Sequence, residues 1–61
     1  MPGRLDDILN EVKPHITAAG NLLGNARNLE SGDANRRDLS IAITALEDAE
    51  LRVLRIQARL S

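Results

Sequence analysis

Apolar residues recur every three or four positions through the second half of the chain. The longest such stripe consists of Leu39, Ala42, Leu46, Ala49, Val53, Ile56 and Leu60. This spacing places seven side chains on one side of an α-helix. No Gly or Pro interrupts the stretch after Asn35, and Asn35 with Asp38 three residues later is typical of a helix start. The pattern therefore predicts a helix over 36–60.

The first half of the chain carries the same spacing. Its stripe consists of Leu5, Leu9, Val12, Ile16, Ala19, Leu23 and Ala26. The stripe continues in phase through Pro14, a residue that lacks the N–H needed for a helical hydrogen bond and crowds the preceding turn. We expect either one helix over 4–28 that is kinked near Pro14, or two helices nearly in line. The unbroken phase favours the kink.

The segment 29–35 between the two stripes is rich in turn-forming residues, with Gly32 and Asp33 at its centre. A segment this short returns the chain antiparallel, so that the two stripes face each other. The predicted fold class is all-α: an antiparallel helical hairpin, with 1–61 as a single domain. The spacing also implies a mild left-handed supercoil.

Several apolar residues lie outside these stripes, and one partner helix cannot cover them all. They are Ile41 on one side of the second stripe and Ile43, Leu51, Leu54 and Ala58 on the other. A chain of 61 residues without Cys buries only about 60% of its unfolded surface and has no disulfide to compensate. Exposed apolar surface on such a chain is typical of self-association. We expect a homo-oligomeric helical bundle, either a dimer or a higher assembly such as a hexamer.

Composition narrows the possible partners. Eight basic and nine acidic residues give a net charge of −1, and Phe, Tyr and Trp are absent. This balance argues against DNA or RNA polymers and against a polybasic membrane anchor. A bound base would rest on aliphatic or guanidinium groups instead of aromatic rings. The chain shows neither a signal-peptide segment nor an apolar run of about 20 residues, so we expect a cytoplasmic protein.

Catalysis and metal binding lack their usual residues. The chain has no Cys and a single histidine, His15, which has no identifiable triad partners. The acids Glu47, Asp48 and Glu50 spread over more than one side of the predicted helix, so they form no metal site with His15. We expect no enzymatic activity, no metal and no cofactor.

Arg36 and Arg37 stand at the predicted start of the second helix. Free N–H groups and the helix dipole favour an anion there, and two guanidinium groups could hold a phosphate through paired hydrogen bonds. The alternative is a solvated helix start that the neighbouring acids Asp33 and Asp38 partly neutralise. The pattern thus indicates a candidate phosphate site.

Four residues of the first helix are further candidates for ligand binding. Lys13 and His15 could donate hydrogen bonds to a phosphate, although Glu11, four residues before His15, also allows an ordinary ion pair on the helix surface. Asn25 and Arg27 lie close to the turn, where they could bind base edges or serve as ordinary surface groups.

The residues Arg37, Asp38 and Ser40, with the run 41–49, resemble the C-terminal helix of small phage proteins that sequester immune nucleotide signals. That family counters the bacterial CBASS and Thoeris defences and shares a helical-hairpin domain. Positions that match or nearly match are Arg37, Asp38, Ser40, Ala42, Thr44, Leu46, Glu47, Asp48 and Ala49. The chain departs from the family at Arg36, Ala45 and Arg52, where the family prefers Ser, Lys and Trp.

The resemblance implies a non-enzymatic sponge that binds cyclic di- or trinucleotide messengers and thereby blocks CBASS-type signalling in the host cell cytoplasm. It makes Arg37 the first candidate for the phosphate site and Arg36 the second, and it adds Thr44 to the ligand-binding candidates. Cyclic ADP-ribose isomers of Thoeris signalling are alternative ligands. A structural or adaptor hairpin that binds only another helical protein is the alternative function.

Overall fold

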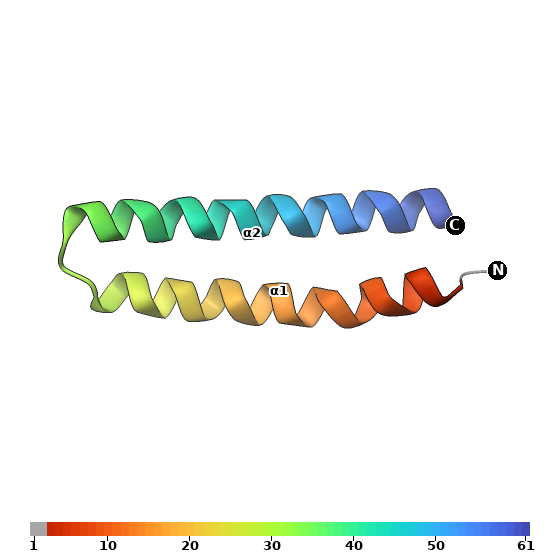
Figure 1. Cartoon of the computed structure of the whole chain (residues 1–61), viewed down its shortest axis with the longest axis horizontal. Coiled ribbons are helices and arrows are strands. Elements are labelled where there is room, and N and C mark those ends of the chain that lie inside the picture. Colours follow the sequence, from red (N-terminus) through yellow and green to blue (C-terminus); the bar gives the residue numbers. More distant parts are fainter. Residues whose placement is uncertain (1–2) are drawn as a thin grey trace.

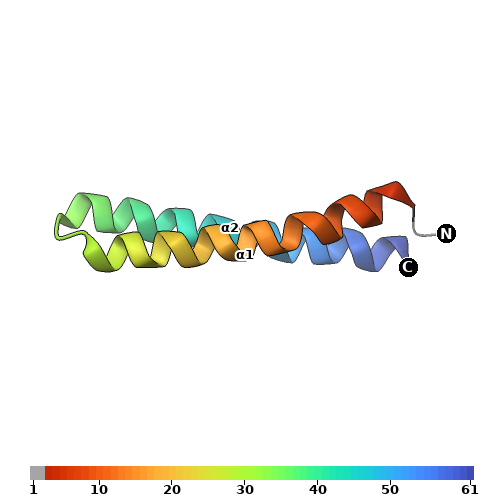
Figure 2. The ribbon, with the colours of Figure 1, turned by 90° about the horizontal axis from the view of Figure 1, so that it is seen from below.

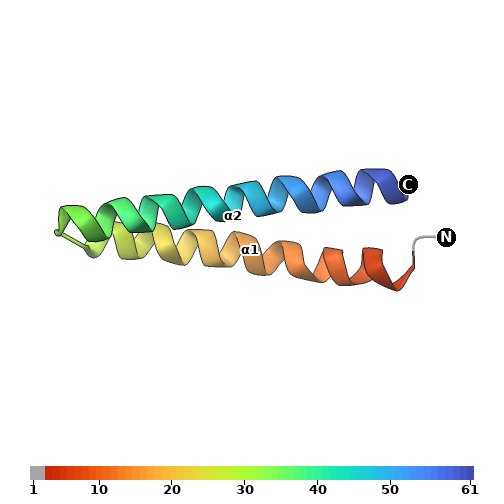
Figure 3. The same ribbon diagram turned by 45° about the horizontal axis from the view of Figure 1, so that its top comes forward.

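The computed structural model describes residues 3–61 and consists of two long helices joined by a short turn (Figure 1). α1 runs over Arg4–Leu29 and α2 over Asp33–Leu60. Figures 1 and 3 show the helices antiparallel and side by side along their whole length. The turn lies at one end, and the start of α1 and the end of α2 lie at the other. The predicted all-α hairpin is confirmed.

The turn is shorter than the sequence predicts. Only residues 30–32 lie outside the helices, instead of 29–35. Gly32 precedes α2, and no side chain caps the first N–H groups of that helix. The predicted capping by Asn35 and Asp38 is therefore wrong, because both residues lie inside α2. Asn35 donates a hydrogen bond to Glu30 instead.

α1 is a single helix with Pro14 in its interior. Asp6 and Asp7 lie in its first turn, where the helix dipole stabilises carboxylates. Because α1 continues through Pro14 without a break, the alternative of two separate helices nearly in line is excluded. A kink at Pro14 stays a prediction.

Most residues of the two predicted stripes form the contact between the helices, although Ala26 near the turn is exposed. The half-buried residues of α1 include Leu9, Val12, Ile16, Ala19 and Leu23, and those of α2 include Leu39, Ala42, Leu46 and Ala49. Val53 is the one buried residue within the described range, at 9% exposure. Figure 2 shows the two ribbons crossing at a shallow angle, as ridge-into-groove packing of nearly antiparallel helices requires. The core is thus one layer of side chains between two helices.

The last turns near the open end of the hairpin depart from the predicted stripe. Three stripe residues are exposed there: Leu5 (51%), Ile56 (36%) and Leu60 (42%). Gln57 takes the contact position, and its Nε2 donates to Oδ1 of Asp6 (3.2 Å) and of Asn10 (2.9 Å). An α-helix drifts by about 20° per heptad from a strict seven-residue repeat. This drift moves the last apolar residues off the contact and brings Gln57 into it.

The two broad faces of the hairpin differ in composition, as the rotation of about 100° per helical residue shows. One face, which we call the apolar face, gathers Leu5, Ile8, Ala19, Leu22, Ala26, Leu29, Ile41, Ala42, Ala45, Ala49, Ile56 and Leu60. The same rotation also puts His15, Asp38, Arg52 and Arg59 on this side, and arginines stand beside Ile56 at the open end. The opposite face, which we call the polar face, carries Asn10, Thr17, Asn21, Gly24, Asn28, Ile43, Glu47, Glu50 and Leu54. Each face is formed by both helices.

Candidate functional site

The turn is organised by the carboxylate of Glu30. Its Oε1 accepts hydrogen bonds from the backbone N–H groups of Ser31 (2.8 Å) and Gly32 (3.0 Å), and its Oε2 accepts one from Nδ2 of Asn35 (2.9 Å). The bond from Gly32, followed by those from Asn35 and Ser31, lowers the pKa of Glu30 below its usual value. The Glu30 carboxylate is therefore a negative charge of the chain itself, placed just before α2.

Arg36 contacts the end of α1. Its Nη1 donates to the carbonyl oxygens of Arg27 (2.7 Å) and Glu30 (3.1 Å). The last carbonyl groups of a helix have no partner within that helix, and a cation near them also favours the negative end of the helix dipole. Arg36 therefore satisfies these groups and ties α1 to α2. Its predicted role in phosphate binding competes with this contact.

Arg37 lies on a different surface, the outer edge of α2. An open recess there, which we call the outer-edge site, is lined by Arg37, Ser40, Ile41, Thr44, Ala45 and Asp48. Within residues 3–61, no hydrogen bond or ion pair engages the Arg37 guanidinium. Of the two adjacent arginines, Arg37 is thus the one whose donors are all free of contacts with residues 3–61, whereas Nη1 of Arg36 is occupied.

The two hydroxyl groups of the outer-edge site take part in helix contacts. Oγ1 of Thr44 donates to the carbonyl oxygen of Ser40 (3.1 Å). Oγ of Ser40 accepts a hydrogen bond from Nη1 of Arg27 on α1 (3.1 Å). This second bond joins the two helices and holds Arg27 at the margin of the site. The structure therefore brings together three predicted ligand residues: Arg37, Thr44 and, through Ser40, Arg27.

The remaining candidates lie elsewhere on α1. Lys13 is half-buried and His15 is exposed. Because a helix rises by 1.5 Å per residue, Lys13 lies about 20 Å from Arg27 along the axis. Asn25 is exposed, and two helical steps rotate it away from the side that Arg27 presents to α2. Within one chain, Lys13, His15 and Asn25 do not join Arg37.

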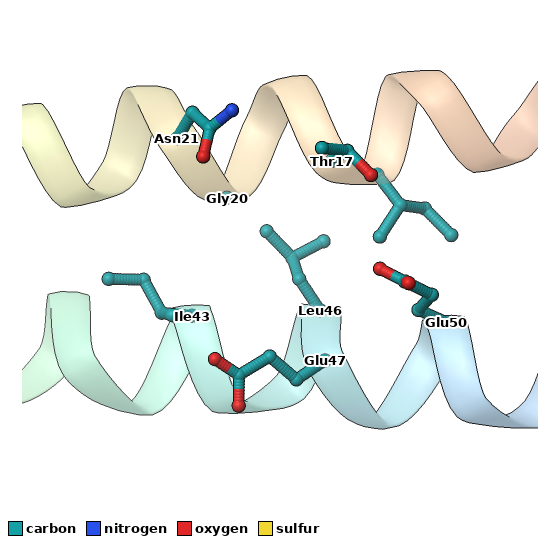
Figure 4. Close-up of a pocket in the computed structure, with 8 residues that line it drawn as sticks. Thr17, Gly20, Asn21, Ile43, Leu46, Glu47 and Glu50 are labelled. Carbon is teal, nitrogen blue, oxygen red and sulfur yellow. The ribbon is translucent and has the colours of Figure 1, made fainter.

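A second recess lies between the helices on the polar face (Figure 4). Its volume is about 210 Å³, and it is lined by Ile16, Thr17, Gly20, Asn21, Ile43, Leu46, Glu47 and Glu50. Figure 4 shows Leu46 and Glu50 pointing toward α1, while the Glu47 side chain lies along α2. Small-molecule sites usually measure about 300–1,000 Å³, and carboxylates repel phosphate. This recess does not fit an anionic messenger.

Glu30 and Ser40 make contacts that are not among those predicted from the sequence. Glu30 precedes Ser31 and Gly32, and a carboxylate in that position can reach successive N–H groups of a turn. That local order is a usable sequence signal for Glu30. The bond between Ser40 and Arg27 joins residues on different helices, and no local pattern indicates it.

Comparisons with known proteins assign no family. No family model matches the chain, and neither a curated protein nor a solved structure matches it. In the part of the chain that the structure describes, no group of three or more His, Asp or Glu residues could hold a metal ion. Neither α1 nor α2 is long and apolar enough to cross a membrane. The outer-edge site is therefore characterised by its own geometry alone.

Proposed function

We propose that the chain is a non-enzymatic sponge, a homo-oligomeric hairpin that binds cyclic di- or trinucleotide immune messengers and so blocks CBASS-type anti-phage signalling. The outer-edge site carries this proposal. The Arg37 guanidinium, which no group of residues 3–61 engages, stands there beside the hydroxyl groups of Ser40 and Thr44. These are positions at which the chain resembles the phage sponges.

The chemistry of the outer-edge site suits a nucleotide. A guanidinium binds phosphate through two parallel N–H bonds, and Ile41 and Ala45 offer an aliphatic surface for a base. Asp48 at the far margin is paired with Arg52, with 2.8 Å between Oδ2 and Nε. This pair offsets the repulsion that Asp48 would exert on phosphate. Sequestration then needs affinity and abundance but no reaction, because mass action alone lowers the free messenger.

Assembly would complete the site. A cyclic dinucleotide carries two phosphates, whereas one chain offers a single Arg37. Two copies related by a two-fold axis supply two such groups. We include in this proposal a bend of α1 at Pro14, where the helix lacks one N–H. The bend would determine which part of a second copy Lys13 and His15 can contact.

Arg37→Ala tests the outer-edge site. We expect messenger binding to weaken by about 1.5–3 kcal/mol, the scale of a hydrogen bond to a charged group, as measured by titration calorimetry with cyclic di- and trinucleotides. Folding should be unchanged because Arg37 is exposed. Arg59→Ala removes the same charge at the far end of α2, where salt screens it from the site. Equal losses would indicate diffuse electrostatics, and unchanged binding in Arg37→Ala would contradict the site.

The apolar face supports a second candidate function, a structural or adaptor hairpin that binds only helical proteins. Its exposed Leu and Ile side chains, such as Leu22 at 68% exposure, fit helices better than nucleotides. Thermal unfolding with a messenger panel that includes cyclic ADP-ribose isomers separates the two functions. A ligand at about 100 times its Kd adds about 2.7 kcal/mol to the free energy of unfolding. No shift with any messenger would favour the adaptor.

A further inference from the structure

The large apolar side chains that the hairpin leaves exposed gather on one side. Nine Leu and Ile residues are exposed among residues 3–61, and all but Leu51 and Leu54 lie on the apolar face. Leu22, Ile41 and Ile8 are 68%, 60% and 47% exposed. Single exposed apolar side chains are ordinary, whereas a contiguous patch marks an interaction surface. The apolar face is such a patch.

The core of the hairpin is thin. Val53 is its one buried side chain within the described residues. Domains normally pack two layers of secondary structure around a core, but this hairpin is a single layer of two helices. A second layer on the apolar face would bury Ala19, Ala42 and Ala49, which are now half-buried. The missing layer therefore belongs on this face.

The shape of the apolar face suits a copy of itself. A groove of about 540 Å³ runs between the helices and is lined by Ala19, Leu22, Leu23, Ala42, Ala45 and Leu46. The alanines would let another helix approach to the ordinary packing distance of about 8–10 Å, while the more exposed Leu22 would project into the approaching partner. A surface with both a groove and a ridge can dock onto an identical surface.

The size of the face also matches a stable interface. The hairpin measures 49 × 15 × 10 Å, so its broad face has a flat area of about 700 Å², close to the roughly 800 Å² that each partner of a stable complex buries. The polar face has the same dimensions but carries only two of the nine exposed Leu and Ile side chains, whereas the apolar face carries seven. Both faces carry charged side chains: Glu47 and Glu50 on the polar face, and arginines beside Ile56 at the open end of the apolar face. The area of the face and its share of the exposed apolar side chains together favour coverage of the apolar face.

We infer that a second copy of this chain covers the apolar face, so that two hairpins form a four-helix bundle. A copy fits better than a foreign protein because the covering layer completes the core of the hairpin itself, and a copy is present whenever the chain is made. Obligate homodimers often have no stable folded monomer. The inference shares the homo-oligomer with the proposed function, but it needs no messenger. Because Ala45 lines both the groove and the outer-edge site, the second copy would border that site, and a bound base would lie at the margin of the interface.

The first test uses the unmodified chain without messenger. Light scattering at micromolar concentration should report at least twice the mass of the chain. The thermal midpoint should rise with protein concentration, since mass action couples assembly to folding. A monomer with full helicity and a midpoint independent of concentration would overturn the inference. A failure of messenger binding would leave it standing, because no messenger enters this experiment.

The second test compares two charged substitutions at exposed leucines. Leu22→Glu places a carboxylate on the apolar face, and Leu51→Glu, at 54% exposure, places one outside it. We expect Leu22→Glu to raise the dissociation constant of the assembly at least tenfold and Leu51→Glu to change it by less than about twofold. Helicity that Leu22→Glu loses at low concentration and regains at high concentration would support the inference. Equal effects, or dissociation by Leu51→Glu alone, would overturn it. Should Leu22→Glu fail to fold at any concentration, the concentration series of the unmodified chain decides.

Discussion

The apolar and polar faces are built from the same two helices, yet they share the exposed apolar side chains unequally, with seven large ones on the first and two on the second. Each helix has more apolar side chains than the other helix can cover, and on both helices most of the surplus falls on the same side of the hairpin. On the other side, α1 carries Asn and Thr while α2 carries Glu47 and Glu50. Placing the surplus apolar side chains of both helices on the same side would not stabilise a hairpin that remains a monomer. The contrast therefore indicates that the apolar face is the side better suited to packing against another helix.

Leu46 separates the two faces, because it lines the recess on each of them. We expect Leu46→Ala to lower the free energy of unfolding by about 2–4 kcal/mol, the lower part of the range for leucine truncation, since the side chain is half-buried. Urea unfolding measures this change. Leu54→Ala on the polar face, where the side chain is 44% exposed, is the matched control and should cost less than about 1 kcal/mol. Equal losses would mean that the polar face is covered as well.

Gly24 offers a gentler test of the same contrast. A Cβ at Gly24 would meet no atom within 4 Å, and Ala is the better helix former, so Gly24→Ala should stabilise the chain by about 1 kcal/mol. The reverse change on the apolar face, Ala26→Gly, should destabilise it by at least as much, with a further loss if a copy packs there. Thermal midpoints report both variants. A destabilised Gly24→Ala would reveal an unrecognised chain or ligand on the polar face.

Glu30 lies in the turn, which both faces share. We therefore expect its protonation to lower the stability of the hairpin without favouring either face, and by less than the substitutions above. The pKa of Glu30 is lowered in the folded chain, chiefly by the N–H of Gly32, from its usual 4.5. Its contribution to stability is therefore present above pH 4.5 and is lost as the pH falls through the lower folded value. Thermal melts at neutral and acid pH should show a drop in midpoint that Glu30→Gln partly removes. The contacts are exposed, so the effect is small. Identical pH profiles for both chains would contradict this role.

The helices and their contact could be predicted because one rule, the spacing of apolar residues, governs both. Leu39, Leu46 and Val53 line up in the sequence and meet α1 in the structure. The ends of the helices follow weaker rules. Asp33 favours a turn in isolation, but it is also stable in the first turn of a helix, where the dipole favours a carboxylate. The structure takes the second option, which shortens the turn.

The candidate site could be predicted only in part. Arg36 and Arg37 are adjacent and chemically identical, and the sequence assigns both to a phosphate. One helical step of about 100° separates them in space, so that Arg36 reaches the carbonyl groups of Arg27 and Glu30 while Arg37 stands on the outer edge of α2. That distinction depends on where the end of α1 lies, and a local pattern does not contain this information.

The start of α1 and the end of α2 share one end of the hairpin, where Gln57 bonds to Asp6 and Asn10. A domain fused to either terminus would therefore sit at the opposite end from the turn of a molecule 49 Å long. Two hairpins could also be encoded in tandem, with the end of one joined to the start of the next by a flexible linker. Such a fusion would make docking intramolecular, and the linker would set an effective concentration that dilution cannot lower.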